Sequence, residues 1–259
     1  MNLLRLIYPL KLREKIYFHL LFNKGFPGDA KGEVRLEFAP VSLSQLCSTD
    51  CAHEQMAWTG FYELALTRRI ASLARGGGLL IDVGANVGYF TCLWLALNPG
   101  NSALAFEPVP QNAEILKQNV TRAGFSRRMR LFECAAGEKS SEMLFDLMSE
   151  EQTGWGGLTT QPSGRTIRVQ VCRLDEVVPR DRVIQVLKID TEGADAWVLD
   201  GAQSLLRCKQ IEHVFFEQNL PRMKSLGLPP DAPFRILELC GYKIEAIGGD
   251  DVTFYARPN

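Results

Sequence analysis

The stretch Leu79-Leu80-Ile81-Asp82-Val83-Gly84-Ala85-Asn86-Val87-Gly88 decides the fold. Its apolar part, residues 79–83, is short and bounded by glycines, as in a strand buried on both faces of a parallel sheet. Gly84 then permits a sharp turn without a Cβ atom, and Gly88 lets the next helix begin close to a ligand above the loop. The sequence therefore predicts a ligand-binding loop at the end of a buried strand.

A carboxylate follows about twenty residues later, where a second strand is expected to end. Apolar residues 103–106 predict that strand, and Glu107 and Pro108 come directly after it. A carboxylate in this place can accept hydrogen bonds from both hydroxyls of a ribose. We therefore predict a nucleotide-type cofactor site formed by Asp82, Gly84, Ala85, Asn86, Gly88, Tyr89, Phe90, Glu107 and Pro108.

The spacing of the loop distinguishes between two cofactors. A dinucleotide site requires G-x-G-x-x-G, because three glycines serve a pyrophosphate on the helix N-terminus. Asn86 occupies the middle glycine position here. Asp82 would repel a pyrophosphate, whereas it would attract a cationic methionyl ammonium or sulfonium. S-adenosylmethionine therefore fits better than NAD, and an NAD(P)-linked oxidoreductase is kept as the less favoured alternative.

A second apolar strand ending in acids and a glycine lies further along, at Leu187-Lys188-Ile189-Asp190-Thr191-Glu192-Gly193-Ala194-Asp195. Together with Asp-Val-Gly-Ala-Asn-Val-Gly at 82–88, it resembles the FkbM-type family of S-adenosylmethionine-dependent methyltransferases. The segments Cys134-Ala135-Ala136-Gly137 and Leu174-Asp175-Glu176 are also similar to segments of that family. The resemblance spans roughly residues 61–255. It implies a Rossmann-like class I methyltransferase fold and a contact of Ala135 with the cofactor.

The resemblance also implies the reaction. Members of the family mostly methylate hydroxyl oxygens of sugars, glycolipid or polysaccharide units and natural products, so O-methylation of such a small-molecule or carbohydrate acceptor is expected. This chain has Thr191 where valine is common and Asp195 where glutamate is common. The acceptor of a relative therefore does not transfer to this chain. A catalytically silent protein that binds S-adenosylmethionine and acts as a partner is the alternative from another functional class.

Methyl transfer from a sulfonium requires an acceptor oxygen held about 3 Å from the methyl carbon, with a base beside the hydroxyl. Asp190 or Glu192 is the predicted base, and Glu217 is predicted to orient the hydroxyls of the acceptor. Lys188 lies two residues before Asp190 on the same strand face and is expected to tune it. Two other roles stay open: the acids cap the following helix, or they share a divalent cation, which no ligand motif indicates.

A glycine-rich loop over residues 149–164 interrupts the regular pattern. Gly154, Trp155 and Gly156 suit either a mobile lid, in which Trp155 stacks on a sugar ring beside Gly156, or an ordinary surface loop. His213 comes early on its strand, far from the expected crevice, and is interpreted as structural.

Composition limits the partners and the compartment. The chain has 259 residues, 46% of them hydrophobic, and a formal net charge of −1, so it can form a sizeable core but offers no basic surface for nucleic acid. The segment after Asp190 also lacks the Asn/Asp-Pro-Pro-aromatic loop of base-amine methyltransferases. Seven scattered cysteines indicate a reducing cytoplasm, and Cys47, Cys51 and His53 lack a second pair that would complete a zinc site.

Residues 1–58 are expected to form an accessory segment, and residues 59–259 the methyltransferase domain. The first 25 residues predict a basic amphipathic helix whose charges exclude a membrane span, and no signal-peptide cleavage site follows. Such a helix could pack on the catalytic domain, which we favour, pair with a second subunit as a homodimer, or lie peripherally on an anionic membrane. Residues 25–32 break this helix, and residues 34–38 predict a short strand.

Strands and helices then alternate, which predicts an α/β fold with a mostly parallel, doubly wound sheet. Strands are expected at 79–83, 103–106, 129–134, 184–190 and 211–217, and helices at 61–74, 89–97, 111–123 and 195–206. Residues 143–147 and 167–171 predict additional strands, and 244–247 with 252–256 a closing antiparallel pair.

Overall fold

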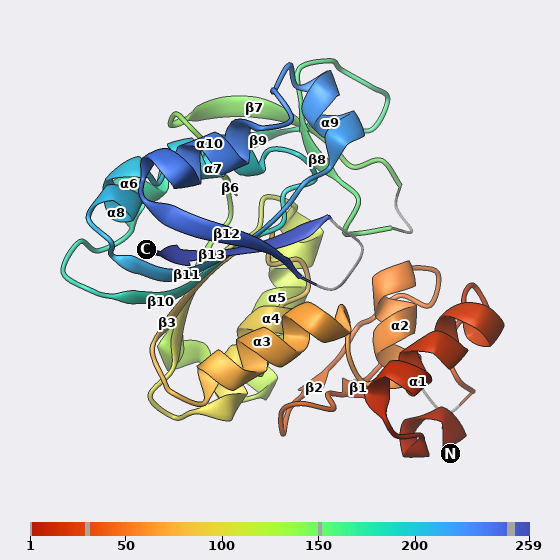
Figure 1. Cartoon of the computed structure of the whole chain (residues 1–259). Coiled ribbons are helices and arrows are strands. Elements are labelled where there is room, and N and C mark those ends of the chain that lie inside the picture. Colours follow the sequence, from red (N-terminus) through yellow and green to blue (C-terminus); the bar gives the residue numbers. More distant parts are fainter. Residues whose placement is uncertain (1, 29–31, 150–151, 248–251) are drawn as a thin grey trace.

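A computed structural model of the protein describes residues 2–28, 32–149, 152–247 and 252–259 (Figure 1). Its centre is a seven-stranded sheet in the order β12-β13-β11-β10-β3-β4-β5. The parallel strands are β3 (Leu79–Val83), β4 (Ser102–Phe106), β5 (Met129–Phe132), β10 (Ile184–Ile189) and β11 (Ile211–Glu217). The closing antiparallel pair is β12 (Tyr242–Ile247) and β13 (Thr253–Pro258). This order confirms the predicted Rossmann-like class I methyltransferase fold.

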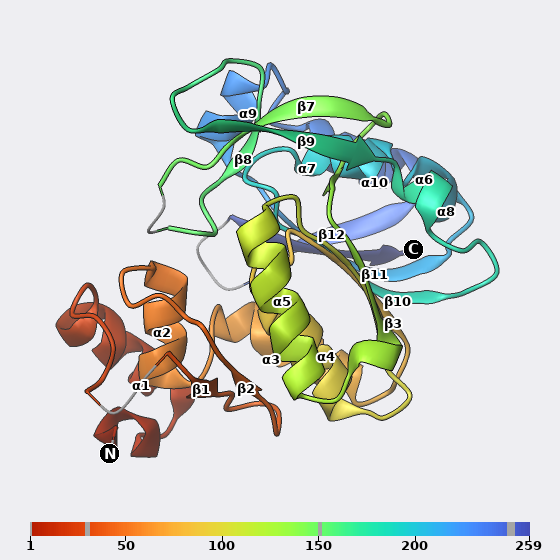
Figure 2. The same cartoon turned by 180° about the vertical axis from the view of Figure 1, so that it is seen from behind.

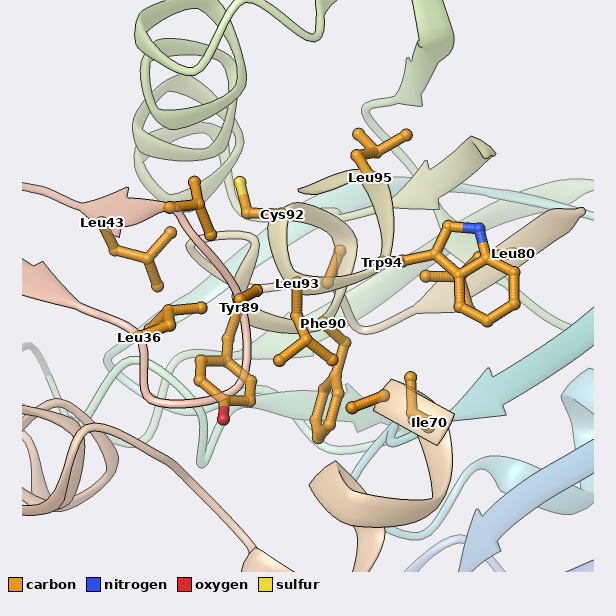
Figure 3. Close-up of a cluster of buried hydrophobic side chains, with 14 of the residues drawn as sticks. Leu36, Leu43, Ile70, Leu80, Tyr89, Phe90, Cys92, Leu93, Trp94 and Leu95 are labelled. Carbon is orange, nitrogen blue, oxygen red and sulfur yellow. The ribbon is translucent and has the colours of Figure 1, made fainter. Parts of the chain in front are cut away.

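Helices cover both faces of the central sheet (Figures 1 and 2). One face carries α3 (Leu64–Ala74), α4 (Tyr89–Leu97) and α5 (Pro110–Arg122), and the other carries α6 (Leu174–Val177), α7 (Asp195–Asp200), α8 (Gln203–Arg207) and α10 (Ala232–Leu239). Each face of the sheet has its own hydrophobic core under these helices. The apolar run of β3 serves both, because Leu80 packs in the core beneath α3, α4 and α5, and Leu79 and Ile81 pack in the core on the opposite face. Figure 3 shows Leu80 and Trp94 of α4 in the same cluster of buried side chains.

A smaller sheet, in the order β6-β9-β7-β8, lies above the central one (Figure 1). Its strands are β6 (Ala135–Ala136), β7 (Ser141–Asp146), β8 (Gly157–Thr159) and β9 (Thr166–Cys172). The predicted strands at 143–147 and 167–171 thus exist, and they pair with each other rather than with the central sheet. Residues 150–151 of the predicted loop lie outside the described residues, and the loop is not wholly irregular, because it contains β8.

The single predicted helix over 195–206 is wrong, because the chain forms α7 and α8 with a turn at Gly201. A Cβ atom on Gly201 would lie 2.1 Å from the carbonyl oxygen of Gly137, so the chain can approach β6 this closely only without a side chain. The helices α2 (Cys51–Thr59), α9 (Leu220–Ser225) and α10 were not predicted.

The single basic helix predicted at the N-terminus is also wrong. Residues 3–21 form a 3-10 turn η1 (Leu3–Leu6), the helix α1 (Leu10–Ile16) and a π-helical turn η2 (Tyr17–Leu21). The chain is interrupted at Pro9, which has no backbone N–H to continue a helix and instead stands at the N-cap of α1. A short hairpin, β1 (Val34–Arg35) with β2 (Ser42–Leu43), follows.

Arg13 holds this N-terminal segment in place. Its side chain is fully buried, although it belongs to the segment for which a basic amphipathic helix was predicted. The guanidinium group donates to the backbone oxygens of Thr59 at 2.8 Å and Ile7 at 3.2 Å and pairs with Glu37 at 2.8 Å. Arg13 therefore ties α1 to the last residue of α2 and to Glu37 after β1, and α1 also contacts α3. In the part of the chain that the structure describes, no helix has the length and apolar character needed to cross a membrane.

Candidate functional site

The first cavity lies at the carboxyl ends of β3 and β4. Its polar wall is formed by Glu107 and the loop residues Gly84 and Asn86. Its apolar wall includes Val83, Phe106, Pro108, Ala135, Ala136, Phe145 and Leu158, and Gly156 contributes backbone. A cavity with an apolar side and the carboxylates of Glu107 and Asp190 has the composition that a nucleoside with a cationic substituent requires. Several of the residues predicted to bind a cofactor are thus brought together here.

Glu107 is the central polar group of the first cavity and is only 4% exposed. Its two carboxylate oxygens accept hydrogen bonds from the backbone N–H of Asn86 at 2.8 Å and of Val109 at 3.0 Å. Burial nevertheless raises the pKa of Glu107 to about 7. An ionised carboxylate has about four lone-pair sites, so both oxygens keep acceptor capacity for a diol.

The loop between β3 and α4 requires its glycines. Gly84 has φ +73°, and a Cβ atom there would lie 1.9 Å from the carbonyl oxygen of Asp190. Gly88 has φ +90°, and its Cβ atom would lie 3.0 Å from the side chain of Leu116 on α5. Asn86 also adopts a positive φ, +48°. The close approach of Gly84 to Asp190 brings the two predicted sequence motifs into direct contact.

The second cavity opens beside the first. The two cavities share Gly84, Asn86, Gly154 and Asp190. Carboxylic acids and aromatic rings form much of its wall, which includes Phe18, Phe22, Tyr62, Glu63, Ala85, Tyr89, Phe90, Trp155, Lys188, Asp190, Glu192 and Glu217. The residues predicted to be catalytic are therefore assembled in one place, and Asp190 stands where the two cavities meet.

Lys188 joins the two motifs beneath this junction. Its ammonium group lies 3.1 Å from the carbonyl oxygen of Gly84, 3.3 Å from Oδ2 of Asp190 and 3.6 Å from Oδ1 of Asp82. Burial alone would lower the pKa of Lys188, but the carboxylates of Asp190 and Asp82 outweigh it and raise the pKa above its usual range. Lys188 therefore stays charged and fixes the position of Asp190.

Asp82 lies one layer below the cavities instead of in their walls. It is fully buried, and its Oδ2 accepts a hydrogen bond from the Thr91 hydroxyl at 2.7 Å. Side chains alternate along β3, so Val83 reaches the first cavity while Asp82 faces α4 and Lys188. Asp82 was expected to contact the ammonium or sulfonium group of the cofactor directly, and its buried position does not allow this contact. Its charge instead balances Lys188.

The carboxyl groups of two predicted acids, Glu192 and Glu217, have a raised pKa. Burial, followed by the charge of Asp190, raises the pKa of Glu192 to about 7, and Asn219 donates to its Oε2 at 2.7 Å. Burial, again followed by Asp190, raises the pKa of Glu217 well above its usual value. Asp195 instead holds the loop after β10, because its carboxylate accepts hydrogen bonds from the backbone N–H groups of Thr191 and Glu217.

Glu63 is a candidate that sequence reasoning missed. It precedes α3 with φ +42°, a conformation that non-glycine residues rarely adopt, and its carboxyl group lines the second cavity. Burial, followed by the charge of Asp190, raises the pKa of Glu63 to about 7. Its Oε2 is buried without a hydrogen-bond partner among the described residues. A glutamate before a helix is so common that no sequence signal could have singled it out.

The loop that was predicted as a lid or a surface loop borders both cavities. Thr153 donates its backbone N–H to Asp50 at 2.7 Å and its hydroxyl to Oδ1 of Asn86 at 3.2 Å. Arg222 of α9 donates to the carbonyl oxygen of Trp155 at 2.6 Å. The Trp155 side chain is 52% exposed and lines the second cavity, as expected of an acceptor contact. The loop is thus held by the accessory segment, the cofactor loop and α9.

The histidines, and the described cysteines other than Cys51, do not line either cavity; Cys51 lines the second. His213 bonds to the Tyr255 hydroxyl at 2.7 Å, away from both cavities, and His53 Nδ1 accepts from the backbone N–H of Cys47. Across the described ranges, no three His, Cys, Asp or Glu side chains are grouped in a way that could hold a metal ion.

The sequence model of the Methyltransferase FkbM domain matches residues 82–244, more than half of the chain. The chain belongs to the FkbM methyltransferase family. "31-O-demethyl-FK506 methyltransferase FkbM" of Streptomyces tacrolimicus is 27% identical over 160 residues, which are 50% of this chain and 61% of that protein. "Methyltransferase 1" of Beauveria bassiana is 25% identical over 143 residues, 47% of this chain and 57% of that protein. The matches thus cover less than two thirds of either curated relative.

Among solved structures, cofactor-bound Rv0187 from MTB aligns with a TM-score of 0.46 at 14% identity, over 75% of this chain and 80% of that one. Precorrin-6y C5,15-methyltransferase from Geobacter metallireducens aligns with a TM-score of 0.43 at 14% identity, over 75% and 87%.

The match to the FkbM domain covers only part of the site. It includes both sequence motifs, Glu107, the loop around Trp155 and Glu217. Glu63 and the aromatic residues Phe18 and Phe22 lie before its first residue. The residues that line the first cavity therefore all belong to the matched domain, whereas the second cavity also uses residues outside the match.

Proposed function

We propose that this FkbM methyltransferase uses S-adenosylmethionine to methylate a hydroxyl oxygen of a sugar, a glycolipid or polysaccharide unit, or a natural product. One observation carries the proposal: the nucleoside-like first cavity and the acid-lined second cavity meet at Gly84 and Asp190. A donor in the first cavity would face an acceptor in the second. The name of the relative "31-O-demethyl-FK506 methyltransferase FkbM" specifies an oxygen acceptor, which supports the choice of oxygen.

The residues of the first cavity fit S-adenosylmethionine, which supplies a methyl group on a sulfonium. Glu107 would accept the ribose hydroxyls, and the apolar side chains of Phe106, Phe145 and Leu158 would hold the base. The backbone of residues 84–86 would carry the methionyl part toward Asp190. No glycine-rich pyrophosphate cradle competes with this arrangement, because Asn86 stands at the middle glycine position.

Asp190 is the best placed base, because it lines both cavities while Glu192 lines only the second. Lys188 holds one carboxylate oxygen at 3.3 Å, which leaves the other for the proton of the acceptor hydroxyl. Glu217 and Glu63 would form hydrogen bonds with further hydroxyls of the acceptor. Displacement then needs the oxygen held in line with the methyl group, which is a matter of positioning.

The test is a transfer assay with S-adenosylmethionine that carries a labelled methyl group. Purified protein is incubated with a panel of sugars, glycolipids and polyketide-type alcohols, and products are analysed for a labelled methyl ether. The Asp190→Asn variant and the conservative variant of an exposed acid, Glu114→Gln, serve as test and control.

Formation of a labelled methyl ether by the unchanged protein and by Glu114→Gln, but not by Asp190→Asn, would support the proposal. Label on nitrogen or carbon would contradict O-methylation. Binding of S-adenosylhomocysteine without transfer to any acceptor would favour the silent binding partner. Binding of NAD in place of S-adenosylhomocysteine would favour the oxidoreductase.

A further inference from the structure

The N-terminal segment exposes an apolar face. More than half of the large exposed hydrophobic side chains in the described part of the chain belong to its first 22 residues: Leu3, Leu6, Tyr8, Leu12, Phe18, Leu20 and Phe22. Leu3 and Leu6 are three residues apart on a 3-10 turn and therefore share one edge. Exposed apolar side chains gathered in this way mark an interaction surface. In Figure 1 the segment forms one end of the molecule.

Basic side chains accompany this face. Lys11 and Lys15 are exposed and four residues apart, so they lie on one side of α1, and Lys24 is exposed beyond the π-helical turn. Glu14 is the one acidic residue between positions 2 and 24, and it is partly buried. Arg13, the other cation of α1, points inward. The surface therefore combines exposed leucines and aromatics with cations, as interfacial membrane segments do.

The same face leads to the acceptor cavity. Phe18 and Phe22 are exposed, their ring centroids lie 6.1 Å apart, and both line the second cavity together with Trp155. The aromatic mouth of the cavity is thus continuous with the apolar face. An acceptor with an apolar tail could rest on this face while its hydroxylated head reaches Asp190.

We infer that this face docks on an anionic lipid surface and that the acceptor is an amphiphile presented there, with a hydroxylated head and an apolar tail. The part concerning the acceptor rests on the proposed function. A second copy of the chain fits the face less well, because a two-fold interface pairs a patch with itself and would bring Lys11 and Lys15 of both copies together. An anionic headgroup layer instead pairs these lysines with opposite charge.

The experiment is co-sedimentation of the full chain with vesicles of phosphatidylcholine alone and of phosphatidylcholine mixed with phosphatidylglycerol. We expect binding to the mixed vesicles and little binding to the neutral ones. The double variants Leu6→Ser/Leu20→Ser and Lys11→Gln/Lys15→Gln should each weaken binding about tenfold or more, since each removes two interfacial contacts. Leu239→Ser, which changes an equally exposed leucine on α10 (81% exposed), should bind like the unchanged chain.

The position of the cavity mouth relative to the lipid is tested with vesicles that contain brominated phosphatidylcholine, which quenches nearby tryptophan fluorescence. Quenching that is smaller in Trp155→Phe would place the mouth of the cavity at the lipid. Equal binding to neutral and anionic vesicles, no effect of the leucine variant, or a dimer in sedimentation velocity that Leu6→Ser/Leu20→Ser abolishes would overturn the inference. Calorimetry with S-adenosylhomocysteine on the same samples separates this inference from the proposed function. A protein that binds S-adenosylhomocysteine but no vesicles would contradict only the lipid docking.

Discussion

Replacing Glu107 by glutamine tests the cofactor side of the site with little change in shape. The two carboxylate oxygens of Glu107 accept the backbone N–H groups of Asn86 and Val109. Glutamine has one carbonyl oxygen and one NH₂ group. The NH₂ group cannot accept a hydrogen bond, so either one of these backbone N–H groups or one ribose hydroxyl loses its acceptor. The loss of one hydrogen bond to a charged acceptor costs about 1.5–3 kcal/mol, which is roughly a ten- to hundredfold weaker Kd at about 1.4 kcal/mol per tenfold.

The pH dependence gives the same test a second readout. Burial raises the pKa of Glu107 to about 7 in the free protein, and ribose hydroxyls bind the ionised carboxylate. Binding therefore releases a proton, and affinity should fall as the pH drops below about 7. In Glu107→Gln this part of the pH dependence should be absent.

Isothermal titration calorimetry with S-adenosylhomocysteine, repeated across neutral pH, measures both effects. Glu114→Gln on the exposed side of α5 is the matched control and should behave like the unchanged protein. A Kd for Glu107→Gln within about twofold of the unchanged value, with the same pH profile, would refute the role of Glu107 as the ribose acceptor.

Three further predictions concern the rest of the site. Asp190→Asn should lower kcat about 10²- to 10⁴-fold while the Kd for S-adenosylhomocysteine changes little, and a preserved kcat would move the base elsewhere. Trp155→Ala should raise KM for the acceptor and spare cofactor binding; unchanged acceptor kinetics would remove the lid loop from acceptor recognition. The Sγ atoms of Cys134 and Cys172 lie 3.1 Å apart, so the oxidant diamide should couple them into a disulfide with loss of two hydrogens. Intact protein mass would show this, and a crosslink that persists in Cys172→Ser would contradict it.

Local patterns in the sequence predicted the centre of the fold well. The apolar run 79–83 and the helix 89–97 appear with those bounds, because glycines punctuate them and both faces of β3 are buried. The contact between Gly84 and Asp190 could not be predicted, since it depends on the pairing of β3 with β10. The position of Asp82 was misjudged because its place before the loop was weighed above the alternation of side chains along a strand.

The acceptor side was much less predictable. Glu63, Phe18 and Phe22 reach the second cavity from elements that no motif connects to the catalytic acids. Arg13 is fully buried although arginine seldom is, so residue type gave no indication of its position. Its burial follows from backbone oxygens of Ile7 and Thr59 that are distant in sequence. Tertiary contacts of this kind leave no local periodic signal.

A crystal structure of the complex with S-adenosylhomocysteine tests the central claim most directly. The account predicts adenosine in the first cavity, with both ribose hydroxyls on Glu107, and the sulfur at the junction facing Asp190 and the second cavity. Adenosine bound in another place, or a sulfur directed away from Asp190, would contradict it.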